Sequence, residues 1–237
     1  MIGVRELCRI APELSVDYVR LLVRDGGNKR ELPVFYPKHI SRDKPIHFSF
    51  EAAWLFFLAL KISQANKITF AHACRICQDL DHFNGATLQH QVFEIFHENA
   101  ILQDLCLIYT DPDQYSLRGK TVEPKGFYKI DNKHVGIFQL GLQNAPEEKK
   151  LEHAKSLIEE ISGRENSIVV SLSPIRKEFL KRVSEAGFCF YIYGDDDKGY
   201  PIYEITTYAD WVKEWSDVDK APLSQTLLKM LEGDTNA

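Results

Sequence analysis

The stretch GVRELCRIAPELSVDYVRLLVRDGGNKRELPVFYPKHISRDKPIHFSF, residues 3–50, decides the fold predicted for the front of the chain. Apolar residues at helical spacing predict a first helix over residues 4–11, which Pro12 ends. Ser15 can accept a hydrogen bond from a free backbone N–H, so it predicts the start of a second helix over residues 16–24. Two short helices joined by a tight turn are the core of a helix-turn-helix.

The end of the stretch changes from helical to β spacing. Residues 33–36 and 46–50 are β-rich, and the basic loop between them suits the wing of a winged helix. Ser49 then predicts the N-cap of a helix over residues 51–65. That helix is apolar nearly all round, so we expect it to be buried against the first two helices or against another subunit.

Cationic and polar side chains gather on the second helix and in the predicted wing. Tyr18, Arg20 and Arg24 point away from the apolar stripe, and Asp17 could order a neighbouring arginine or accept a hydrogen bond from cytosine. A recognition helix needs such side chains for base edges and for phosphates. The predicted DNA-binding residues are Ser15, Asp17, Tyr18, Arg20, Arg24, Lys29, Arg30, Lys38, His39, Arg42 and Lys44.

The order of VRELCRIA, SVDYVRLLVRDG, a wing and FSFEAAWLFFLALKI resembles the N-terminal DNA-binding domain of MerR-type and excisionase-like winged-helix proteins. The resemblance covers about residues 2–65 and rests on the order of the elements. It implies a winged helix-turn-helix that binds double-stranded DNA in a transcriptional regulator. The family's dimer arm, a long coiled coil, does not follow residues 51–65 in this sequence.

The rest of the chain alternates helices and strands. Helices are predicted over residues 68–82 and 86–98, and the turn at Asp111-Pro112-Asp113 places a domain boundary near residue 110. Beyond it the pattern predicts strands near 115–118, 127–131, 134–142, 167–172, 188–193 and 200–205, and helices over 146–161, 174–186, 208–215 and 223–231. The predicted fold class is α+β. It comprises a winged helix-turn-helix with additional helices over residues 1–110 and a mixed α/β sandwich over residues 111–237.

Charge is distributed unevenly along the 237 residues. Residues 1–67 hold 11 Lys and Arg against 7 Asp and Glu, whereas residues 68–237 hold 18 against 27. This asymmetry is expected if only the front of the chain meets phosphates. The five cysteines are thinly spread, and the sequence shows neither a secretory leader nor a run of about 18 apolar residues. We therefore expect a cytoplasmic protein without a membrane partner.

A metal site is the first alternative chemistry. Cys74 and Cys77 form a Cys-x-x-Cys pair with His72 and His82 nearby, which could bind zinc. No second pair exists, and small apolar cysteines are common in cores. We assign no metal ligand and no cofactor.

A nuclease is the second alternative. Asp195-Asp196-Asp197 could hold Mg²⁺ beside Lys198 and Glu204, although the same composition suits a hairpin turn. Ser173, before a predicted helix, has the simpler role of an N-cap. We assign no catalytic residue.

The predicted function is sequence-specific binding of double-stranded DNA by a transcriptional regulator that acts as a homodimer. Residues 111–237 would supply dimerisation, or a surface for a small-molecule or protein effector. The alternatives are a metal-dependent nuclease targeted by the winged helix, and a protein–protein interaction adaptor.

Overall fold

The computed structural model describes most of both ends of the chain and parts of its middle. The described ranges are 1–26, 46–70, 105–110, 128–130, 133–139, 168–195, 201–215 and 221–232, with single residues 73, 74, 77, 95, 96, 101, 146, 148, 149, 152, 156 and 199. The predicted strands at 33–36 and 115–118 lie outside these ranges, as do most residues of the helices predicted over 68–82 and 86–98.

Residues 1–26 and 46–70, the described part of the front of the chain, form three helices and a small sheet. Its elements are β1 (Ile2–Gly3), α1 (Val4–Ile10), α2 (Val16–Gly26), β2 (His47–Phe48) and α3 (Phe50–Asn66). β1 and β2 pair antiparallel, with Ile2 opposite Phe48. The strand predicted over residues 46–50 is therefore shorter than expected, because Ser49 is already the N-cap of α3 and its hydroxyl accepts a hydrogen bond from the Ala52 N–H at 3.2 Å.

The second half consists of small antiparallel sheets and helices, so the α+β class is confirmed. A four-stranded sheet has the order β4-β5-β3-β6, and a separate hairpin pairs β7 with β8. The elements are β3 (Leu105–Thr110), β4 (Tyr128–Ile130), β5 (Lys133–Gln139), β6 (Ile168–Ser171), α8 (Leu172–Glu185), β7 (Phe188–Asp195), β8 (Pro201–Thr207), α9 (Tyr208–Glu214) and α10 (Leu223–Glu232).

The start of α8 differs from the sequence prediction. The helix begins at Leu172, so the capping position belongs to Ser171, whose side chain makes no capping hydrogen bond. Ser173, predicted as the N-cap, lies inside the first turn. Pro174 is tolerated there because the first backbone N–H groups of a helix have no intrahelical acceptor.

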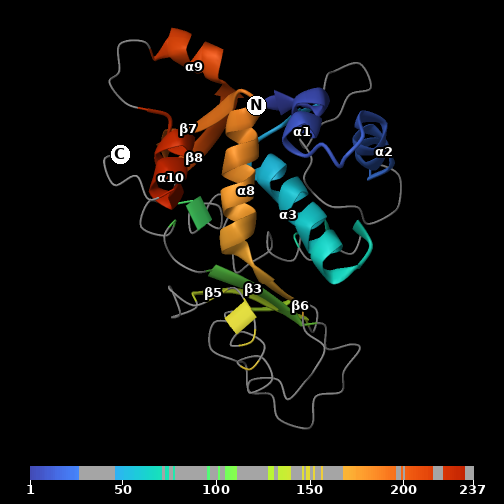
Figure 1. Cartoon of the computed structure of the whole chain (residues 1–237). Helices are drawn as coiled ribbons and strands as arrows, with labels where there is room; N and C mark the ends of the chain where they lie inside the picture. Colours follow the sequence, from blue (N-terminus) through green and yellow to red (C-terminus); the bar gives the residue numbers. More distant parts are fainter. Residues whose placement is uncertain are drawn as a thin grey trace.

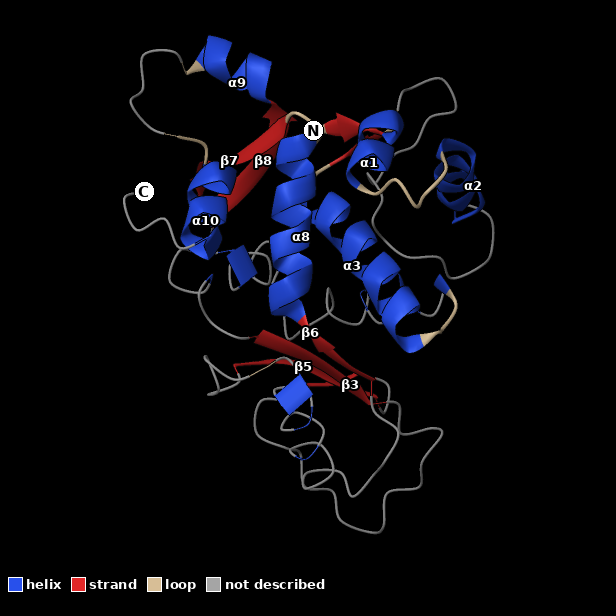
Figure 2. Cartoon of the chain, viewed as in Figure 1, coloured by secondary structure: helices blue, strands red, loops and turns tan. Residues whose placement is uncertain are grey.

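Helix α8 occupies the middle of the molecule (Figure 1). The β7–β8 hairpin and α10 lie on one side of it and α3 on the other, while the four-stranded sheet lies at its N-terminal end. Figure 2 shows that the four-stranded sheet lies at one end of the molecule and most helices lie at the other. Among the described elements, α3 contacts α8 and β8 as well as β2 and β6, whereas the sequence predicted burial against α1 and α2 or another subunit.

The core is rich in aromatic rings and joins distant parts of the chain. The Phe50 ring centroid lies 4.1 Å from that of Phe190 and 5.9 Å from that of Phe179. Trp54 contacts Phe179 at 5.3 Å between centroids. Residues on both sides of position 110 thus share one hydrophobic cluster. The division into domains at that position remains a prediction.

One charged side chain is almost completely buried in this core. Arg176 of α8 is 1% exposed. Its guanidinium donates hydrogen bonds to the carbonyl oxygens of Ile95 at 3.0 Å and Ile101 at 2.6 Å. These bonds tie Ile95 and Ile101 to α8. Among the described helices, none has both the length and the apolar character needed to cross a membrane.

Candidate functional site

The turn between α1 and α2 is closed by local hydrogen bonds. The Ala11 N–H donates to the Leu7 carbonyl at 2.9 Å, and the Leu14 N–H donates to the Ala11 carbonyl at 3.0 Å. The Ser15 hydroxyl accepts from the Tyr18 N–H at 3.1 Å, which confirms its predicted role as an N-cap. Apolar residues on both sides of the turn are buried and pack the two helices together: Leu7, Ile10, Leu14 and Val19.

The outer face of α2 is left uncovered by the described residues. The Asp17 side chain is 97% exposed and that of Arg20 is 55% exposed, and their charged atoms lie 3.9 Å apart. Tyr18 is also exposed, with its ring centroid 6.0 Å from that of Phe70. Partial burial raises the pKa of Tyr18, so its phenol is a neutral hydrogen-bond donor near pH 7. Leu21 completes the exposed face.

The predicted DNA-binding set is thus described only in part. Ser15, Asp17, Tyr18 and Arg20 lie together at the start of α2. Arg24 belongs to the same helix, but its side chain lies outside the described residues. The remaining predicted contacts also lie outside them: Lys29, Arg30, Lys38, His39, Arg42 and Lys44.

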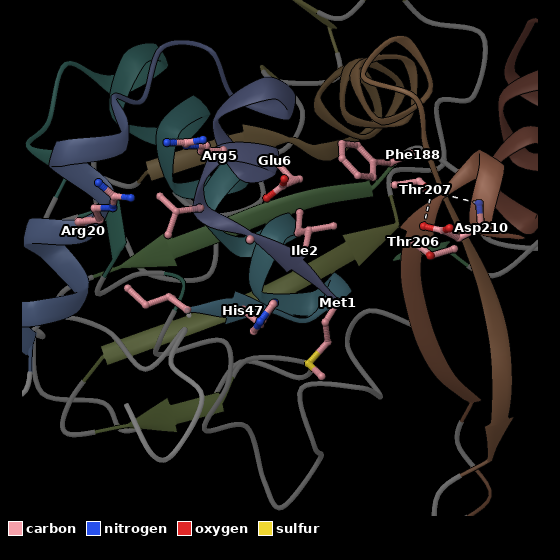
Figure 3. Close-up of a pocket in the computed structure, with 13 residues that line it drawn as sticks. Met1, Ile2, Arg5, Glu6, Arg20, His47, Phe188, Thr206, Thr207 and Asp210 are labelled. Carbon is pink, nitrogen blue, oxygen red and sulfur yellow. Dashed lines mark hydrogen bonds between the residues drawn. The ribbon is translucent and has the colours of Figure 1, made fainter. Parts of the chain in front are cut away.

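A hollow of about 660 Å³ lies beside α1, β1 and β2 (Figure 3). We call it the N-terminal hollow. In Figure 3, Arg5 and Arg20 lie toward one end and Thr206, Thr207 and Asp210 toward the other, with Ile2 and Glu6 between them. Its lining residues are Met1, Ile2, Gly3, Val4, Arg5, Glu6, Arg20, Ile46, His47, Phe188, Thr206, Thr207 and Asp210.

The carboxylates of the hollow already have close neighbours. The Thr207 hydroxyl donates to Asp210 at 2.6 Å, and Lys213 lies 3.5 Å from the same carboxylate. The Thr207 hydrogen bond, with help from Lys213, lowers the pKa of Asp210. Glu6 lies against the backbone of Gly3, where an added Cβ would come within 2.5 Å of its Oε2. The Glu6 carboxylate therefore lies close to the start of α1.

The cations of the hollow are less constrained. Among the described residues, no carboxylate lies within ion-pair distance of Arg5, and Asp17 is the partner of Arg20 at 3.9 Å. Arg5 and His47 are both exposed. No local sequence signal groups these two residues with Arg20, since they come from α1 and β2 and line one hollow only in the folded chain.

A paired set of charges lies where the α1–α2 turn meets α3 and α8. Glu13 accepts two hydrogen bonds from Arg182, each 2.7 Å long. Arg182 and Lys61 both contact Glu178, at 2.6 and 2.7 Å. These four residues, the ion-pair network, join the turn to α3 and α8. The hydrogen bonds that Arg182 donates to Glu13 lower the pKa of Glu13 and raise the pKa of Arg182.

The two alternatives considered from the sequence, a zinc site and a metal-dependent nuclease, find little support in the described residues. Burial raises the pKa of Cys74 to about 12, and Cys77 is buried too, as is common for cysteines in a core. His72 and His82 lie outside the described residues. Where the structure is described, no three His, Cys, Asp or Glu residues gather as metal ligands would. Asp195 is exposed at the end of β7, while Asp196 and Asp197 lie outside the described ranges.

The described residues therefore bring together an exposed helix face and a hollow with two available guanidinium groups. Arginines at a surface can bind phosphate or carboxylate groups in a bidentate manner. Glu204, the carboxylate considered for a nuclease, instead accepts a hydrogen bond from the Tyr191 hydroxyl at 3.3 Å.

Comparisons of the chain with family models, with curated proteins and with solved structures gave no match.

Proposed function

We propose that this chain binds double-stranded DNA in a sequence-specific manner, with α1 and α2 as the helix-turn-helix of a winged-helix domain. The observation that carries the proposal is the exposed face of α2. Asp17, Tyr18 and Arg20 point outward, while Val19 is completely buried against the neighbouring helix. A recognition helix has this division, because one side must be anchored while the other enters the major groove.

The chemistry of the exposed face suits both parts of DNA recognition. Arg20 can bind a phosphate or the O6 and N7 atoms of guanine, and Tyr18 can donate a hydrogen bond. Asp17 can accept a hydrogen bond from the cytosine amino group. Arg5 and His47 extend the cationic surface beside α2. The excess of Lys and Arg in residues 1–67 supports phosphate binding by this part of the chain.

We further propose that the protein is a transcriptional regulator that acts as a homodimer, in the manner of the MerR-type proteins that its N-terminal sequence resembles. A single helix and wing make a small interface with DNA. Two linked copies reading two half-sites bind much more tightly than one. The second half of the chain would hold the two copies together.

Selection from a random duplex library, followed by affinity measurement at several salt concentrations, tests this proposal with the full chain. The wild type should enrich a palindromic site. Arg20→Ala should lower the slope of log K against log salt by about 1 if the arginine contacts a phosphate. Lys181→Ala is the matched control, because Lys181 is an exposed cation on α8, and it should leave the slope unchanged.

Asp17→Asn separates base reading from phosphate binding. It should alter the enriched sequence and leave the salt slope nearly unchanged, since Asp17 would contact a base edge. Equal, weak binding of every duplex by the wild type would contradict the proposal. So would an Arg20 variant with the same salt slope and the same enriched sequence as the Lys181 variant, because Arg20 would then contact neither a phosphate nor a base.

A further inference from the structure

We propose that the N-terminal hollow is the binding site of a small organic anion that also carries a hydrogen-bond donor, such as a hydroxy acid. The part of the proposal that concerns regulation rests on the proposed DNA binding. Binding of the anion itself does not.

The size of the hollow suits a small molecule. Its volume of about 660 Å³ falls in the range typical of ligand pockets. The walls come from widely separated parts of the chain, including β1, α1, α2, β2 and the end of β8. Ile2, Val4 and Phe188 are each less than a tenth exposed and form an apolar floor. Polar side chains rise around an apolar floor in most ligand pockets.

The end of the hollow near α2 can hold an anion. Arg5 has no carboxylate partner among the described residues, and Arg20 has only the solvent-exposed Asp17 at 3.9 Å. An ion pair between such exposed groups is weak, so Arg20 remains available. Two guanidinium groups beside one hollow can donate several charge-assisted hydrogen bonds to a single carboxylate or phosphate group.

The carboxylate in the middle of the hollow favours a ligand that carries a hydrogen-bond donor. Glu6 lines the hollow beside Gly3, and its carboxylate would repel a purely anionic ligand. It would accept a hydrogen bond from a hydroxyl or ammonium group on the same ligand. The side chain of Thr206, at the far end, can donate or accept. A ligand with an acidic group at one end and a donor near its centre satisfies both features.

Arg20 connects this hollow to the proposed DNA interface, because it lines the hollow and also belongs to the exposed face of α2. A ligand that binds its guanidinium would remove a phosphate contact. Linkage requires the reverse effect too, so DNA would weaken binding of the anion by the same factor. The anion would thus act as an effector that releases DNA.

Isothermal titration calorimetry of the full chain, at constant ionic strength, tests the site without DNA. The probes are malate, which has a hydroxyl group, and succinate, which lacks one. Malate should bind saturably and more tightly than succinate. Arg5→Ala should weaken malate binding at least tenfold, whereas Lys181→Ala should leave it unchanged. Glu6→Gln should reduce the preference for malate over succinate, and circular dichroism should show that each variant is folded.

The absence of saturable binding by both probes, or equal weakening by the Arg5 and Lys181 variants, would overturn the proposal. A second titration measures DNA affinity with and without malate. Malate should weaken DNA binding by the wild type and have a smaller effect on Arg5→Ala. Malate binding by a chain that binds no DNA would overturn the proposed function and the regulatory role, and would support the anion site.

Discussion

The ion-pair network and the N-terminal hollow differ in how their arginines are paired. In the network, Glu13 and Arg182 form a bidentate ion pair, and Lys61 and Glu178 extend it between helices. At the hollow, Arg5 and Arg20 have little ionic compensation from the described residues. Both regions contain arginines on helices, but only in the network does an arginine join separate elements.

The difference indicates which charges serve stability and which remain available for binding. Ordering an arginine costs side-chain entropy, which a bidentate pair and neighbouring contacts offset. Arg182 meets that condition, and it also lies over the Phe57 ring, 5.4 Å from its centroid. Arg5 gains little in the folded chain, so its charge can be used by an incoming phosphate or carboxylate.

The largest expected effect is a difference in stability between a variant of the ion-pair network and a variant of the hollow. Arg182→Ala should lower the free energy of unfolding by about 1–3 kcal/mol, between the values typical of exposed and buried ion pairs. Arg5→Ala should change it by less than about 0.5 kcal/mol. Urea denaturation followed by circular dichroism measures both. Equal losses would break the comparison, because Arg5 would then be as structural as Arg182.

The second prediction concerns acid. Because Arg182 lowers the pKa of Glu13, the pair stabilises the folded chain above the ordinary pKa of 4.5, and this stabilisation is lost as pH falls through the lowered value. The stability difference between wild type and Glu13→Gln should therefore be about 1 kcal/mol or more at pH 7 and should shrink below about pH 4. Denaturation at pH 7, 5, 4 and 3 measures it. A difference that grows in acid would contradict the lowered pKa.

A smaller effect is expected at Lys61. Its ammonium lies 2.7 Å from Glu178 and 5.1 Å from the Phe57 ring centroid, and its side chain is mostly buried. Lys61→Met keeps the packing of the aliphatic stem and removes the charge, so it should cost about 0.5–1 kcal/mol. Thermal unfolding of Lys61→Met and Lys61→Ala compares charge with packing. If Lys61→Met costs as much as Lys61→Ala, packing of the stem contributes nothing.

The smallest change in stability is expected for Lys181→Ala, the control variant of the binding experiments. Lys181 and Glu185 form an exposed pair one helical turn apart, with 3.7 Å between charged atoms. Lys181→Ala should change stability by no more than about 0.5 kcal/mol. A larger loss in urea denaturation would mean that Lys181 is unsuitable as the control for the binding experiments.

Local signals in the sequence predicted much of this fold. Ser15 and Ser49 were identified as N-caps because a cap depends on residues only three positions apart, and both capping hydrogen bonds are present. The strands of the β7–β8 hairpin are also predicted, because apolar and polar residues alternate along them and turn residues lie between them. Ser173 was misassigned because Ser171 and Ser173 both precede helical sequence, and Pro174 fits the first turn with either one as the cap.

Features built from distant segments could not be predicted. The apolar surface of α3 indicated burial, but nothing in residues 50–66 names α8 and β8 as its partners. The hollow combines residues from positions 1–6, 20, 46–47, 188 and 206–210. Arg5 and His47 have no motif around them, so their position beside Arg20 depends on the tertiary fold.

The aromatic core also has a consequence for synthesis of the protein. Phe50 and Trp54 are made early, yet their partners Phe179 and Phe190 lie more than a hundred residues later. At ordinary translation rates, on the order of ten seconds pass between synthesis of these rings and synthesis of Phe179 and Phe190. Until then this part of the aromatic core is incomplete, so α1 to α3 would be poorly suited to transfer between proteins as a separate module.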